Sequence, residues 1–133
     1  MKICMIGAGY VGLVSAACFS EFGWQVTCVD KDPKRLDELE AGRSPIYEPG
    51  LDDIMQRNMQ AGRLQFTADL AGAVKDAAVV FLAVGTPMRR GDGYADLSHV
   101  FAAVEEIAPH LKSFAVITTK STVPVGTSRE IEA

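Results

Sequence analysis

Three glycines near the start of the chain have the spacing of a phosphate-binding turn. Gly7, Gly9 and Gly12 form the pattern G-x-G-x-x-G between an apolar run, Ile3 to Ile6, and a helix-like stretch. The first glycine would allow a tight turn, the second would let a pyrophosphate approach the backbone, and the third would let the helix pack closely. The phosphates would lie at the helix N-terminus, where free N–H groups and the helix dipole favour anions. The spacing predicts a dinucleotide site.

An acidic residue at the end of the next apolar run strengthens this interpretation. Asp30 stands eighteen positions beyond Gly12 and closes the β-branched-rich run Val26 to Val29. At the C-terminal end of a strand, its carboxylate can accept hydrogen bonds from the adenosine ribose hydroxyls. We therefore expect a preference for NAD over NADP, because a 2′-phosphate would meet a like charge.

Charged neighbours of Asp30 leave two alternatives open. Lys31 and Arg35 are cations that could accommodate a 2′-phosphate. Asp30 could also do no more than cap the helix that begins near Pro33, a role that Asp32 could take instead.

Two later turns carry hydroxyl groups directly after predicted strands. Thr86 follows the continuous apolar run Ala78 to Val84, and Ser121 with Thr122 follows the weaker run Ala115 to Thr119. The carboxyl ends of parallel strands share one edge of a sheet, so these hydroxyls are expected to face the cofactor. Each could instead belong to an ordinary turn or a helix cap.

The sequence leaves the roles of two other loops open. The segment Arg89 to Asp96 is long, glycine-rich and charged, which suits either a loop over a ligand or a solvated connection. The segment Tyr47 to Gly50, which contains Glu48, could start a helix or face a substrate.

The elements that must position these residues alternate along the chain. Strands are expected at Lys2 to Ile6, Gln25 to Val29, Leu64 to Phe66, Ala78 to Val84 and Ala115 to Thr119, and helices up to Phe22 and at Pro33 to Ala41, Leu51 to Gln60, about Asp69 to Lys75 and Leu97 to Ala108. This order predicts an α/β fold, a Rossmann-like doubly wound parallel sheet with helices on both faces. The run Ala78 to Val84 is expected to be buried on both faces.

Composition limits the classes of partner. The 133 residues are 48% hydrophobic and 23% charged, as in one globular domain, and the net charge of −4 without a basic face argues against nucleic acid. No apolar segment is long enough for a membrane span, and the first residues lack the features of a signal peptide, so a cytoplasmic protein is expected. Cys4, Cys18 and Cys28 show no metal-binding spacing, and we interpret all three as small core residues.

Five stretches together resemble the UDP-glucose 6-dehydrogenases, within the wider family of NAD-dependent nucleotide-sugar dehydrogenases. They are Lys2 to Leu13, Val29 to Asp32, Pro45 to Leu51, Ala83 to Pro87 and Lys120 to Pro124. The loop Arg89 to Gly93, followed by Ala95 to Leu97, is most similar to the UDP-glucose branch. Relatives that act on GDP-mannose or UDP-N-acetylmannosamine usually have a different loop there.

The resemblance implies a role for each predicted site residue. Val11 would lie along the cofactor pyrophosphate beside Tyr10, Asp30 and Arg35 would hold the adenosine portion, and Thr86, Ser121 and Thr122 would line the nicotinamide side. Family members oxidise the sugar's C6 hydroxyl to the acid in two hydride transfers, using two NAD⁺ and a cysteine-bound intermediate.

The family's nucleophilic cysteine lies in a glycine-rich motif far downstream, with a lysine, an asparagine and an aspartate. Positions that match them are absent from these 133 residues, and the three cysteines present are expected to be buried and unreactive. We therefore expect residues 1–133 to be the N-terminal NAD-binding domain of a longer enzyme, a homodimer or higher homo-oligomer, with no catalytic residue of its own. The alternatives are a GDP-mannose or UDP-N-acetylmannosamine dehydrogenase domain, or a non-catalytic NAD-binding module.

Overall fold

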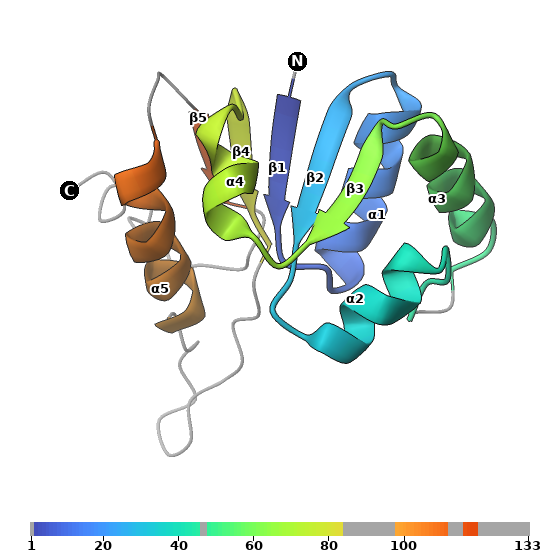
Figure 1. Ribbon diagram of the computed structural model, residues 1–133, viewed down its shortest axis with the longest axis horizontal. Helices are drawn as coiled ribbons and strands as arrows, with labels where there is room; N and C mark the ends of the chain where they lie inside the picture. Colours follow the sequence, from blue (N-terminus) through green and yellow to red (C-terminus); the bar gives the residue numbers. More distant parts are fainter. Residues whose placement is uncertain (1, 46–47, 84–97, 112–115, 120–133) are drawn as a thin grey trace.

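The computed structural model describes residues 2–45, 48–83, 98–111 and 116–119 (Figure 1). These residues form a parallel sheet of five strands in the order β3-β2-β1-β4-β5. The strands are β1 (Lys2–Ile6), β2 (Gln25–Val29), β3 (Leu64–Thr67), β4 (Val79–Leu82) and β5 (Val116–Thr119). The helices are α1 (Tyr10–Glu21), α2 (Pro33–Glu40), α3 (Leu51–Gln60), α4 (Leu70–Lys75) and α5 (Ser98–Ile107). A 3₁₀ turn follows α5 at Ala108–His110. The strand order reverses beside β1, which confirms the predicted doubly wound fold.

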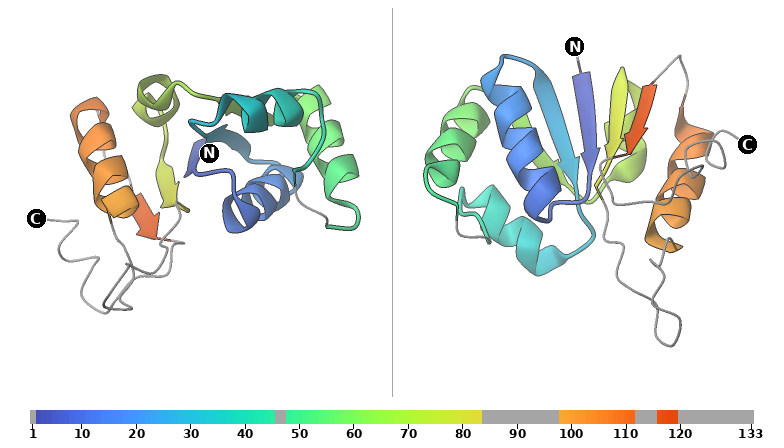
Figure 2. Two further views of the ribbon diagram at one scale, coloured as in Figure 1. Left: turned by 90° about the horizontal axis from the view of Figure 1, so that it is seen from below. Right: turned by 180° about the vertical axis from the view of Figure 1, so that it is seen from behind.

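Helices cover both faces of the sheet. Figure 1 shows α4 in front of the strands, and Figure 2, from behind, shows α1 on the opposite face. Ile3 and Met5 of β1 belong to the core beneath α1, α2 and α3. Cys4 and Ile6 belong to the core that includes α4 and α5. Because successive side chains of a strand point to opposite faces, β1 is buried on both sides, as the central strand of a parallel sheet requires.

The strand β4 is shorter and less buried than its apolar sequence predicts. Val80 and Leu82 are fully buried, whereas Val79 and Phe81 on the other face are only half-buried. The Phe81 ring stacks on Phe19 of α1, with 5.1 Å between the ring centroids. Both half-buried residues pack at the margin of the core beneath α1. The prediction of burial on both faces therefore holds fully for one face of this strand and only in part for the other.

The cysteines also differ from expectation. Cys4 and Cys28 are buried, but Cys18 is exposed. The helical period explains the difference, because α1 turns Ala16, Ala17 and Ser20 toward the protein interior and leaves Cys18 on its outer face. Burial raises the pKa of the Cys4 thiol to about 12 and also raises that of Cys28. The argument that burial makes these thiols unreactive therefore applies to Cys4 and Cys28 only.

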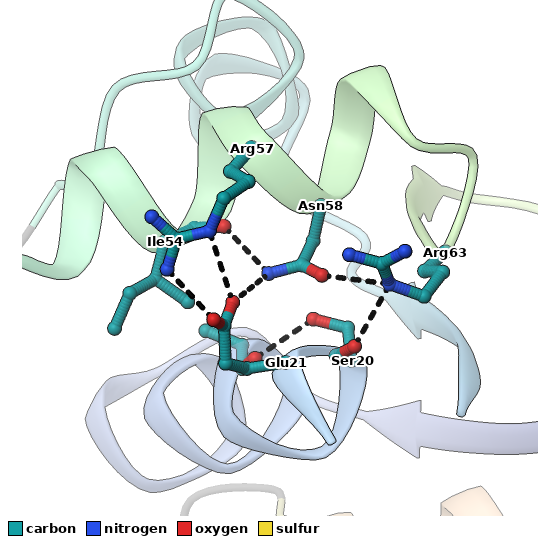
Figure 3. Close-up of polar contacts among 7 residues, drawn as sticks. Ser20, Glu21, Ile54, Arg57, Asn58 and Arg63 are labelled. Carbon is teal, nitrogen blue, oxygen red and sulfur yellow. Dashed lines mark hydrogen bonds and ion pairs between the residues drawn. The ribbon is translucent and has the colours of Figure 1, made fainter. Parts of the chain in front are cut away.

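A polar network fixes the C-terminal end of α1 against α3 (Figure 3). The fully buried Asn58 donates to the Glu21 carboxylate at 2.7 Å and to the Ile54 carbonyl at 2.8 Å, and its own carbonyl accepts from Arg63 Nε at 2.9 Å. Arg57 adds an ion pair to Glu21 at 2.8 Å. Since buried polar groups require partners, this network joins α1 to α3 beside their shared apolar core. Among the described residues, no helix is long and apolar enough to cross a membrane.

Candidate dinucleotide-binding site

The turn between β1 and α1 leaves backbone donors at the start of the helix without a carbonyl partner among the described residues. Gly7 has a φ of 103°, in the left-handed region that favours glycine, and its N–H donates to the Val29 carbonyl at 2.8 Å. Gly9 caps α1, and Leu13 makes the first backbone bond within the helix, to the Gly9 carbonyl at 2.9 Å. The N–H groups of residues 10–12 therefore have no carbonyl partner within α1. Such a helix start attracts an anion.

Gly9 and Gly12 face different surroundings. A Cβ placed on Gly9 would meet no described atom within 4 Å. A Cβ on Gly12 would lie 1.9 Å from the Gly7 carbonyl oxygen and 3.2 Å from the Ala83 Cβ. The close approach of α1 to the sheet thus requires glycine at position 12. At position 9 the space is open, which fits the approach of a pyrophosphate to the backbone.

Asp30 follows β2 and is tied into the same turn. Its Oδ2 accepts from the Ala8 N–H at 2.9 Å and from Arg35 Nη1 at 3.1 Å, and its Oδ1 accepts from the Asp32 N–H at 2.9 Å. Burial tends to raise the pKa of this carboxyl, but the N–H groups of Asp32 and Ala8 and then Arg35 outweigh it and hold the pKa below its ordinary value. Asp30 is therefore ionised at neutral pH. Because a carboxylate accepts about four hydrogen bonds, Oδ1 keeps one direction for a ribose hydroxyl.

The cap of α2 is Asp32 rather than Asp30. The Asp32 side chain accepts from the N–H groups of Lys34 and Arg35, at 3.0 and 3.5 Å. The alternative in which Asp30 serves only as a helix cap is therefore wrong. Its carboxylate points instead to the turn between β1 and α1, where it lies 2.9 Å from the Ala8 N–H.

The two cations beside Asp30 are both engaged. The Arg35 side chain, 38% exposed, pairs with Asp30, whose side chain is only 10% exposed. The Lys31 side chain, 77% exposed, pairs with Glu106 of α5. A 2′-phosphate would have to compete with a carboxylate for either cation.

Tyr10 and Glu48 form a contact that the sequence did not signal. The Tyr10 hydroxyl donates to Glu48 Oε2 at 2.9 Å, and this hydrogen bond raises the pKa of Tyr10. Glu48 precedes α3, and its backbone carbonyl accepts from the Leu51 N–H at 3.1 Å. The two partners are 38 positions apart in the sequence, which explains why local sequence patterns did not predict the contact.

The structure brings seven of the ten predicted site residues to the carboxyl ends of β1 and β2. They are Gly7, Gly9, Tyr10, Val11, Gly12, Asp30 and Arg35. Thr86, Ser121, Thr122, Tyr47 and the loop Arg89 to Asp96 lie outside the described residues. A cavity of about 190 Å³ near the amino ends of β1 and β2, beside α4, contains none of the predicted site residues. Free N–H groups beside an ionised carboxylate match the pyrophosphate and ribose of a dinucleotide.

Comparison with known proteins agrees with this geometry. The sequence profile described as "UDP-glucose/GDP-mannose dehydrogenase family, NAD binding domain" matches residues 1–133. A UDP-glucose 6-dehydrogenase from Rhizobium meliloti is 61% identical over 132 residues, which cover 99% of this chain and 30% of that relative.

Two solved structures share the fold described above. A UDP-glucose dehydrogenase from Pyrobaculum islandicum has a TM-score of 0.91 at 37% identity, with 98% of this chain and 32% of that chain covered. A GDP-mannose dehydrogenase from Pseudomonas aeruginosa, solved as a ternary complex, has a TM-score of 0.92 at 40% identity, with 98% of this chain and 30% of that chain covered. The chain thus spans about 30% of the length of the proteins it matches.

Proposed function

The chain belongs to the UDP-glucose/GDP-mannose dehydrogenase family as its NAD-binding domain, and we propose that the whole protein oxidises the C6 hydroxyl of UDP-glucose to the acid with two NAD⁺. The observation that carries the cofactor part of the proposal is the open helix start beside Gly9, with the ionised Asp30 next to it. The identity to a UDP-glucose 6-dehydrogenase supports this sugar over GDP-mannose or UDP-N-acetylmannosamine.

The described residues bind and orient the cofactor in this proposal. The N–H groups of residues 10–12 hold the pyrophosphate, Val11 lies along it, and Gly9 leaves room for its approach. Asp30 Oδ1 accepts a hydrogen bond from one ribose hydroxyl, while the hydrogen bonds that the carboxylate accepts from the Ala8 and Asp32 N–H groups keep the turn in place. The nicotinamide, when bound, accepts the hydride that leaves C6. We propose that Thr86, Ser121 and Thr122 line the nicotinamide side.

The charge arrangement supports NAD over NADP as the cofactor. Asp30 is ionised and would repel a 2′-phosphate. Arg35 is already paired with Asp30, so a phosphate could bind Arg35 only by breaking or sharing that ion pair. Lys31 is the more exposed cation, but its partner Glu106 adds a further negative charge. The charges around the adenosine ribose are therefore unfavourable to the doubly negative 2′-phosphate of NADP.

The chemical step needs a nucleophile that we assign to a part of the protein outside this chain. Cys4 and Cys28 are buried, and Cys18 lies eight residues after Tyr10, about 12 Å along α1. The sugar-binding and catalytic groups would come from the remaining length that the relatives possess. We propose in addition a homodimer or higher oligomer, which the resemblance to the family implies, and a cytoplasmic location, which the composition supports.

Calorimetric titration of the 133-residue chain with NAD⁺ and, separately, NADP⁺ tests the cofactor assignment. We expect saturable binding of NAD⁺ and at least tenfold weaker binding of NADP⁺, about 1.4 kcal/mol. A folded chain that binds neither nucleotide, or both equally, would contradict the site. A panel of UDP-glucose, GDP-mannose and UDP-N-acetylmannosamine on the full-length protein tests the sugar, and turnover of none would favour a non-catalytic module.

A further inference from the structure

A single hydrogen bond links the start of α1 to the loop before α3. Tyr10 is the first residue of α1, and its hydroxyl donates to Glu48 Oε2 at 2.9 Å. Tyr10 is 56% exposed, so the direction of its side chain is not imposed by burial in the core. The contact fixes an otherwise exposed ring at the helix end where the pyrophosphate would bind.

The Glu48 carboxylate contacts Tyr10 and does not cap the helix that follows it. The N-cap of α3 is Gly50, with a φ of 82° and no side-chain cap bond. Asp52 and Asp53 supply the negative charge in the first turn of α3, where the helix dipole favours it. Capping of α3 therefore does not explain why an acidic side chain stands at position 48.

Two hydrogen bonds hold residues 42–44 against α3, the helix that Glu48 precedes. The Ser44 N–H donates to Asp52 Oδ1 at 2.8 Å, and Gln56 Nε2 donates to the Gly42 carbonyl at 3.0 Å. These bonds tie residues 42–44 to α3, which packs against α1. Glu48, two residues before the N-cap of α3, thus reaches Tyr10 from the start of a helix that packs against α1.

We propose that Glu48 is a positioning residue for the cofactor site, holding Tyr10 and the first turn of α1 ready for the pyrophosphate. This inference rests on the function proposed above and adds to it a residue that does not touch the cofactor itself. The first turn of a helix has few internal hydrogen bonds, so a side-chain contact there reduces the ordering that binding would otherwise require. Glu48 acts through Tyr10 and is not a catalytic residue.

The sign of the effect separates positioning from simple charge. A carboxylate near the pyrophosphate would repel it, so if charge alone mattered, Glu48→Ala and Glu48→Gln would both tighten NAD⁺ binding. Positioning predicts that Glu48→Ala weakens binding, whereas Glu48→Gln, which keeps an acceptor oxygen for Tyr10, stays close to the wild type.

A double-mutant cycle on the NAD⁺ dissociation constant tests the proposal. We expect Tyr10→Phe and Glu48→Ala each to raise Kd about three- to tenfold, and the double variant to be no worse than either alone, as for residues joined in one network. Glu48→Gln should stay within about twofold of the wild type. Arg57→Gln is the matched control, because it breaks an exposed α1–α3 ion pair at the other end of α1 and should leave Kd unchanged.

An ultraviolet titration of the tyrosines measures the pKa of Tyr10 directly. A general loss of rigidity in the protein would not by itself change this pKa. Because Glu48 raises the pKa of Tyr10, Glu48→Ala should lower the pKa of the component that Tyr10→Phe removes. Additive effects in the cycle, an unchanged Kd, an unmoved pKa, or tighter binding in both Glu48 variants would overturn this inference alone. A folded wild type that does not bind NAD⁺ would overturn the proposed function together with it.

Discussion

Alanine at Gly9 and at Gly12 should separate the ligand role of the turn from its packing role. Gly9 has φ −74° and ψ −167°, a conformation open to alanine, and a Cβ there meets no described atom within 4 Å. Gly9→Ala should therefore keep the free energy of unfolding, or raise it by about 0.4–1 kcal/mol, because alanine restricts the unfolded chain. A methyl group beside the pyrophosphate should cost about 1–3 kcal/mol of binding, roughly 5- to 150-fold in Kd.

Gly12→Ala should have the opposite profile. Its Cβ would lie 1.9 Å from the Gly7 carbonyl oxygen, which is backbone and cannot rotate away, so α1 would have to move by about 1 Å or more. Such overpacking costs about 3 kcal/mol at the upper end of the usual range, and the better helix propensity of alanine returns only about 1 kcal/mol. We expect a net loss of about 2 kcal/mol or more in the free energy of unfolding.

Urea unfolding, followed by the fluorescence of Trp24, the one tryptophan of the chain, measures the stability of each variant. Calorimetric titration with NAD⁺ measures binding. A Gly9→Ala protein that binds NAD⁺ like the wild type would refute the assignment of this glycine to the pyrophosphate. A Gly12→Ala protein as stable as the wild type would show that α1 does not need its close approach to the sheet.

Three further results are expected. Asp30→Ala should weaken NAD⁺ binding by about 1–3 kcal/mol and also lower stability, since the buried Ala8 N–H loses its acceptor; an unchanged Kd in calorimetry would remove Asp30 from the site. Folding lowers the pKa of Asp30, so the stability that its carboxylate contributes is complete above the ordinary pKa of 3.8 and is lost as pH falls through the lower pKa of the folded state. Urea unfolding of the wild type and of Asp30→Asn across this pH range should show the difference in the free energy of unfolding. A thiol reagent should modify Cys18 quickly in the folded protein and the two buried cysteines only after unfolding; fast modification of all three would contradict the burial that raises the pKa of Cys4 and Cys28.

The sequence predicted the sheet well because local patterns determine it. The strands β1 and β2 have the bounds that their apolar runs gave, and α3 starts and ends where its helical spacing predicted. The parallel pairing of the strands follows from the alternation of β and α units, whereas their order in the sheet comes from the structure. Burial was predicted less well, because the apolar composition of α1 does not show that Cys18 lies on its outer face.

The interactions of the site were predicted in type but not in detail. Asp30 was recognised from its place after β2, yet its bond to the Ala8 N–H depends on how the β1–α1 turn folds in three dimensions. The Tyr10–Glu48 bond likewise joins residues that only packing brings together. Spacing along the chain identifies groups that can bind, whereas their partners depend on contacts between distant segments.

The structure also explains why the glycine turn and Asp30 belong to one unit. The Asp30 carboxylate accepts from Ala8, which stands between the first two glycines of the turn, so the proposed ribose acceptor also supports the loop that receives the pyrophosphate. Loss of Asp30 therefore removes a ligand contact and loosens the neighbouring site at once, and its effect on binding cannot be assigned to the ribose alone. Gly9→Ala does not disturb this support, because its methyl group meets open space. Comparison of the two variants therefore separates the contribution of ligand contact from that of a preformed turn.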